Sequence, residues 1–159
     1  MQAQSRTDFD LADYAPIIME VIDSGGEFRL FPRGTSMLPL LRQGKDSVVL
    51  VKGTKTPQKR DIIFYKRPNG QFVLHRILRV EKDGTFVLCG DNQTLLEKGI
   101  TRDMIIASVS AFYRGETRRE INSVSNRIYE IFWCFMPLRK LVFFARRALS
   151  KIKRTIFKR

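Results

Sequence analysis

The chain has 159 residues, of which 43% are hydrophobic, and it carries a formal net charge of +13 at pH 7. This length suits one domain with a hydrophobic core, and the composition excludes a disordered or collagen-like chain. The single histidine, His75, excludes a site with several histidine ligands. Cys89 and Cys134 lie too far apart for a metal or redox motif. We therefore expect neither a metal nor a cofactor.

The first predicted element is a helix within residues 1–26. In the stretch DLADYAPIIMEVIDSGG, apolar residues recur at helical spacing and a pair of glycines ends the pattern. Pro16 favours a helix start nearer Ala15. The first ten residues are polar, so we expect no signal peptide, and no apolar run is long enough for a full transmembrane span.

Residues 27–115 are expected to form a mainly β, antiparallel domain. Alternating, β-branched runs follow one another, and they are separated by turn residues: EFRLFP, DSVVLVK, DIIFYKR, QFVLHRILRVE, GTFVLCG and MIIASVSAFYR. The stretches RPNGQ and EKDGT predict hairpins, because Asn-Gly and Asp-Gly supply the positive φ angles of tight turns.

Residues 116–159 are expected to form a helical, basic amphipathic tail that Pro137 breaks or kinks. From Leu138 onward apolar residues share one helical face, basic residues lie off it, and no acidic residue follows Ile131. This pattern is typical of a peripheral element on an anionic membrane. We expect Leu138–Arg159 to bind such a surface, on the cytoplasmic face. Docking on the β-domain or on a partner is the alternative, and nucleic acid is the least favoured partner.

The stretch FPRGTSMLPLL places Ser36 at a tight turn after an apolar run. One interpretation is a helix N-cap, made by Thr35 or Ser36. The other is an exposed nucleophile, which needs a neighbouring base, and His75 in QFVLHRIL is the candidate. The stretch VLCGDNQTLLEKG supplies two carboxylates, Asp91 and Glu97, either of which could orient the imidazole.

Several of these stretches occur in a fixed order: GTSMLPLL, LRQGKDSVVLV, RDIIFYKR, FVLHRI and LCGDNQ. Together they resemble the motifs of the superfamily of signal peptidase I and LexA-like serine peptidases. The histidine in VLHRI is similar to that of the endoplasmic-reticulum and archaeal signal peptidases. The resemblance implies a β-domain of that type, with Ser36 as nucleophile and His75 as general base. It leaves Asp91 and Glu97 as alternatives for the third catalytic residue.

The function that these patterns favour is a serine endopeptidase that cleaves a precursor or leader peptide at a membrane surface. The peptide is expected to bind as an extended strand beside Ser36. Its side chains would enter a shallow pocket lined by Phe31, Gly34, Met37, Leu38 and Phe72. The alternatives are a catalytically inactive peptide-binding module and a LexA-type regulator. Against the regulator, only one short helix precedes the β-domain, where a DNA-binding unit would need more.

Overall fold

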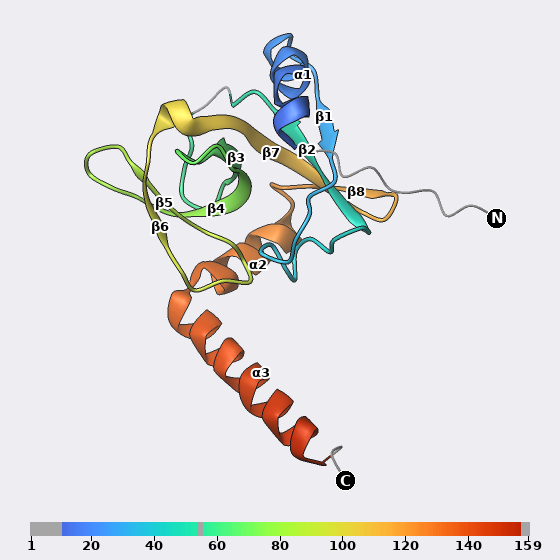
Figure 1. Cartoon of the computed structure of the whole chain (residues 1–159), viewed down its shortest axis with the longest axis vertical. Coiled ribbons are helices and arrows are strands. Elements are labelled where there is room, and N and C mark those ends of the chain that lie inside the picture. The colour runs from blue at the N-terminus through green and yellow to red at the C-terminus, as the bar shows by residue number, and fades with distance from the viewer. Residues whose placement is uncertain (1–10, 54–55, 157–159) are drawn as a thin grey trace, which may run out of the picture.

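The computed structural model describes residues 11–53 and 56–156. The first ten residues of the predicted N-terminal segment and the last three of the predicted tail lie outside the described residues. The described chain is a mainly antiparallel β protein with three α-helices, which confirms the predicted fold class (Figure 1). Its elements are α1 (Leu11–Asp23), β1 (Phe28–Leu30), β2 (Asp46–Val51), β3 (Ile62–Lys66), β4 (Phe72–Val80), β5 (Phe86–Cys89), β6 (Glu97–Ile100), β7 (Ile105–Arg114), β8 (Thr117–Glu120), α2 (Val124–Cys134) and α3 (Met136–Ile156).

The strands form one sheet in the order β1-β2-β7-β3-β4-β5-β6, and β8 pairs with β7. Both predicted hairpins are confirmed. Gly70 between β3 and β4 and Gly84 between β4 and β5 have φ angles of +87° and +83°. The turns are closed by hydrogen bonds from the Arg67 amide to the Gln71 carbonyl and from the Glu81 amide to the Thr85 carbonyl.

The N-terminal helix starts earlier than predicted. It runs from Leu11, so the expected start near Ala15 is wrong, and Pro16 lies inside the helix. Gly25, in the left-handed conformation with φ of +85°, ends it as the sequence predicts. The buried side chains Ile18 and Ile22 attach this helix to the sheet.

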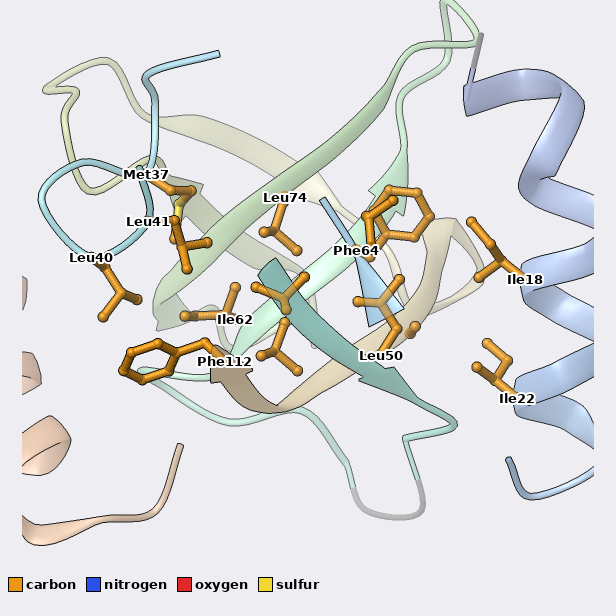
Figure 2. Close-up of a cluster of buried hydrophobic side chains, with 14 residues drawn as sticks. Ile18, Ile22, Met37, Leu40, Leu41, Leu50, Ile62, Phe64, Leu74 and Phe112 are labelled. Carbon is orange, nitrogen blue, oxygen red and sulfur yellow. The ribbon is translucent and has the colours of Figure 1, made fainter. Parts of the chain in front are cut away.

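The main hydrophobic core joins α1, the sheet and the turn that carries Ser36. Figure 2 shows Met37, Leu40 and Leu41 reaching from this turn into the same cluster as Ile18 and Ile22. All five side chains are buried. Burial of side chains of this size contributes roughly 1.5–3 kcal/mol each. The buried side chains of Met37, Leu40 and Leu41 therefore fix the turn that carries Ser36 to the core.

Two strands, β6 and β8, were not predicted. The residues EKGI of β6 show no period-two pattern, and the residues TRRE of β8 are all exposed. Pairing with a neighbouring strand, and not the burial of an apolar face, creates these two strands. The predicted C-terminal helix is broken as expected, with α2 ending at Cys134 and Pro137 in the first turn of α3. None of the described helices combines the length and apolar character needed to cross a membrane.

Candidate active site

Ser36 lies in a turn between β1 and β2, not at the start of a helix. The Leu38 amide bonds to the Thr35 carbonyl at 3.2 Å, and the Leu41 amide bonds to the Met37 carbonyl at 2.9 Å. The segment makes only turns, so the N-cap interpretation has no helix to cap. Gly34 has a φ of +86°, which favours glycine, and its amide donates to the Gln43 side chain.

His75 is the fourth residue of β4, where it pairs with Ile63 of β3. Its side chain is only 2% exposed. The ring nitrogen Nδ1 lies 2.9 Å from Glu97 Oε1 and 3.3 Å from the Tyr65 hydroxyl. A carboxylate at this distance favours the tautomer with the proton on Nδ1, which leaves Nε2 as a free base.

The free nitrogen of His75 and the backbone of Ser36 meet at Gly90. A Cβ atom built on Gly90 would lie 2.7 Å from the Ser36 carbonyl oxygen and 3.0 Å from His75 Nε2. The Ser36 carbonyl also accepts a hydrogen bond from the Asn92 amide at 2.6 Å. The fold therefore brings together three motifs that are far apart in the sequence: GTS, LHR and GDN. Among the described residues, no hydrogen bond joins the Ser36 hydroxyl to His75.

Glu97 is the carboxylate that lies within hydrogen-bond distance of His75. It lies on the unpredicted strand β6, opposite Leu88 of β5. Arg67 holds it through two hydrogen bonds, one of them from Nε to Oε2 at 2.8 Å. Burial raises the pKa of Glu97, but hydrogen bonds from Arg67 and Tyr65 outweigh this effect, and the pKa is lowered overall. Glu97 is therefore ionised at neutral pH.

The electrostatic surroundings keep His75 neutral. Burial lowers the pKa of His75 below its ordinary value of 6.5, and the nearby charge of Glu97 offsets this only in part. A neutral imidazole at neutral pH is the form that a general base requires.

Asp91 has a different role. It is fully buried and forms a bidentate pair with Arg76, with both distances at 2.9 Å. The Tyr129 hydroxyl of α2 also donates to Asp91 Oδ2, at 2.9 Å, so this oxygen accepts from both Arg76 and Tyr129. No hydrogen bond or ion pair joins Asp91 to His75 in the described chain. The geometry therefore favours Glu97 over Asp91 as the residue that orients the imidazole.

A small pocket of about 60 Å³ opens beside Ser36. It is lined by three of the five predicted pocket residues, Gly34, Met37 and Phe72. Phe31 and Leu38 do not line it, and Phe31 is 58% exposed. The remaining lining side chains come from β1, β3, β4 and the turn before β2: Leu30, Pro32, Arg33, Leu41, Gln43, Phe64 and Leu74.

Sequence reasoning missed Tyr65 and Arg67. Tyr65 is buried on β3, and in the antiparallel register it lies diagonally across from His75. A signal for it existed, because the alternation of β3 and the hairpin at Gly70 together fix which β3 residues share a face with His75. Arg67 follows β3 directly, but its partner Glu97 lies on a strand that has no sequence pattern.

The fold and the site together define a mainly β protein in which His75 lies between Glu97 and the Gly90 loop, and that loop lies against the backbone of Ser36. No family model, no curated protein and no solved structure matches the chain. Residues 11–53 and 56–156 contain no group of three or more His, Cys, Asp or Glu side chains that could hold a metal ion.

Proposed function

We propose that the protein is a serine endopeptidase in which Ser36 is the nucleophile, His75 the general base and Glu97 the residue that orients it. One observation carries this proposal. His75 has Glu97 on its Nδ1 side, and on its Nε2 side it has Gly90, which also contacts the backbone of Ser36. A polar ring that is buried solely for packing has no need of an ionised, Arg-held carboxylate on one nitrogen and a serine turn beside the other.

The reaction follows from these positions. Ser36 Oγ attacks the carbonyl carbon of the scissile peptide bond while His75 Nε2 takes the hydroxyl proton. Backbone amides around Ser36 stabilise the oxyanion, since Gly34 offers no hydroxyl for this purpose. The imidazolium then gives its proton to the leaving amine, and an acyl-enzyme remains. A water molecule, deprotonated by the same imidazole, hydrolyses the ester and frees Ser36.

The substrate that fits this site is an extended precursor or leader peptide with a small side chain next to the cleaved bond. The pocket beside Ser36 has a volume of about 60 Å³ and a largely apolar lining that includes Met37, Phe64 and Phe72. This volume corresponds to a few water molecules, which suits a side chain of alanine or valine size.

We place the reaction at a membrane surface, with the protein held peripherally on the cytoplasmic face. The net charge of +13 supports this placement, because the cytoplasmic leaflet carries the anionic lipids that attract basic segments.

A catalytically inactive peptide-binding module is the second candidate. The observation that favours it is the missing hydrogen bond between the Ser36 hydroxyl and His75. In an active enzyme, bound substrate brings these two groups within reach, and catalytic hydrogen bonds are often looser without substrate.

Digestion of a mixed peptide library, followed by mass spectrometry, tests the proposal. We expect cleavage after small residues by the wild type. Ser36→Ala and His75→Ala should each lower the rate roughly 10³-fold or more. Glu97→Gln should lower it by about 10²-fold. Urea unfolding of each variant serves as the control for folding. Peptide binding without cleavage by a folded wild type would favour the inactive module.

A further inference from the structure

Helix α2 buries polar side chains and exposes apolar ones, the reverse of an ordinary surface helix. Its buried residues are the polar Asn126 and Glu130. Tyr129, Trp133 and Cys134 are partly buried. Five other apolar side chains point outward at helical spacing, and each is more than half exposed: Val124, Ile128, Ile131, Phe132 and, just past the end of the helix, Phe135. A surface helix ordinarily turns its apolar stripe toward the core. Among residues 11–53 and 56–156, nothing covers the exposed apolar stripe of α2.

Helix α3, which follows α2 directly, also exposes apolar side chains. It runs away from the sheet (Figure 1), and its apolar side chains range from partly buried to exposed. Leu141, Phe144 and Leu149 are all highly exposed. This arrangement speaks against the alternative that α3 docks on its own β-domain. We call the exposed apolar residues of α2 and α3, from Val124 to Leu149, the apolar ridge.

The charges around the apolar ridge are basic. Arg127, Lys140 and Arg146 are exposed on the same two helices. The only acidic residue from Val124 to Arg159 is Glu130, which is buried and paired with Arg76. A partner must therefore offer an apolar layer together with negative charge.

We propose that the apolar ridge docks on the surface of an anionic lipid bilayer. Apolar side chains would enter the boundary between headgroups and acyl chains, and the basic side chains would meet anionic headgroups. A second copy of the chain fits less well, because it would bring two basic surfaces together without acidic partners. Nucleic acid would leave the apolar side chains uncovered.

Docking would hold the candidate active site close to the lipid. Arg139, in the first turn of α3, is fully buried and donates to the Gly90 carbonyl at 3.0 Å. Gly90 in turn contacts both Ser36 and His75. Arg139 and Gly90 thus connect the proposed lipid-binding helix to the proposed catalytic residues. Cleavage of peptides that lie at the membrane rests on the proposed peptidase function, whereas the docking itself does not.

Co-sedimentation with vesicles tests the docking. The full-length protein should bind vesicles made of equal parts phosphatidylglycerol and phosphatidylcholine, and it should bind pure phosphatidylcholine at least about tenfold more weakly. Ser36→Ala should bind as well as the wild type, so a failure of the peptidase proposal leaves this result intact. Binding to anionic vesicles should weaken as salt is raised.

Two double variants locate the surface. Ile128→Asp with Phe132→Asp on α2, and Leu141→Asp with Phe144→Asp on α3, should each lower vesicle binding about tenfold or more. Ile17→Asp is the matched control, because Ile17 is 49% exposed on α1 and should bind like the wild type. Three results would overturn the proposal: no binding to anionic vesicles, equal binding to both lipids, or unchanged binding by folded double variants. Dimers in ultracentrifugation that the double variants abolish would assign the ridge to a second copy instead.

Discussion

At the scale of single residues, the environment of His75 decides what chemistry the site can perform. Burial lowers the pKa of the ring, while Glu97, itself held ionised by Arg67 and Tyr65, limits that lowering. The base is thus neutral at physiological pH, and the proton on Nδ1 is directed at a fixed carboxylate. Because a general base works in its neutral form, the proposed activity should survive mild acidification and fall only as the pH passes below the lowered pKa.

An NMR titration can measure this pKa without ambiguity, since His75 is the only histidine in the chain. We expect a value below 6.5 for the folded protein. Glu97→Gln should lower the pKa further, because it removes the negative charge that favours the imidazolium. The acid limb of the rate profile should move to lower pH by the same amount. A His75 pKa that does not change in the folded Glu97→Gln variant would contradict the assignment of Glu97.

Gly90 offers a second residue-scale prediction. Alanine at this position would place its Cβ atom 2.7 Å from the Ser36 carbonyl oxygen, so the Ser36 turn or the Gly90 loop must shift. A misplacement of about 1 Å near reacting groups lowers rates about 10²-fold. We expect such a loss in peptide cleavage by Gly90→Ala. Gly53→Ala is the control, because its Cβ would approach the side chains of Ser108 and Arg102 and neither Ser36 nor His75. Equal rates for the two folded variants would be evidence against a catalytic role for the contact at Gly90.

The sequence predicted part of the candidate site at this scale. Ser36 and His75 stood out because a hydroxyl at a glycine turn and a polar ring on an apolar strand each call for an explanation. The choice between Asp91 and Glu97 depends on tertiary contacts. Asp91 is bound by Arg76 and Tyr129, and Glu97 reaches His75 only through the pairing of β5 with β6. Neither contact leaves a local pattern in the sequence.

At the scale of elements, the first turn of α3 and the end of α2 hold the loop from Cys89 to Gln93. Arg139 donates to the carbonyls of Gly90 and Gln93, and the Trp133 indole donates to the Asp91 carbonyl at 2.6 Å. These bonds add strong side-chain donors to the backbone oxygens of the loop, and the Gly90 carbonyl also accepts from the Gln93 amide at 3.0 Å. The helices therefore fix the loop on which the site depends.

Arg139→Ala should lower the free energy of unfolding by about 2–4 kcal/mol, because the carbonyls of Gly90, Gln93 and Trp133 lose a charged donor at once. Urea unfolding measures this loss. Lys140→Ala, one position further along the same helix and exposed, should change stability by less than about 0.5 kcal/mol. Similar unfolding midpoints for both variants would show that the α3 contact does not stabilise the loop.

Elements with a strong local pattern were predictable, and the others were not. The β3–β4 and β4–β5 hairpins carry both alternation and a glycine turn, and they form as predicted. The strand β6 forms because β5 offers it an edge, and β8 forms because β7 does. The start of α1 was misplaced because packing of its apolar face on the core outweighs the preference of Pro16 for a first turn.

At the scale of the whole molecule, two truncations separate the roles of the C-terminal helices. A chain that stops after Lys140 keeps Arg139 and Trp133, so it should fold and cleave peptides in solution but lose vesicle binding. A chain that stops after Ser123 also loses Tyr129 and Glu130, the α2 partners of the buried Arg76–Asp91 pair, and should be less stable by roughly 3 kcal/mol or more. Unfolding and vesicle binding are the measurements. Equal stability of the two shortened chains would refute a structural role for α2.

The fold class followed from the sequence because period-two alternation and turn residues cover most of residues 27–115, and the mainly antiparallel sheet confirms it. The membership in the signal peptidase and LexA-like superfamily stays a prediction, since it depends on the order of short motifs. Only the α3 part of the apolar ridge could be predicted from the sequence. The amphipathic pattern of α3 is visible in the sequence, whereas the outward apolar face of α2 depends on which of its faces the Arg76–Asp91 pair binds.

Covalent labelling of the intact protein with a fluorophosphonate tests the central claim most directly, because this reagent modifies a serine only when a neighbouring base activates it. We predict a single adduct, located on Ser36 by mass spectrometry. It should form about 10²-fold or more slowly in His75→Ala, and more slowly in Glu97→Gln than in the wild type. If Ser36 of the folded wild type remains unlabelled, or is labelled at the same rate without His75, the Ser-His-Glu account of this protein is wrong.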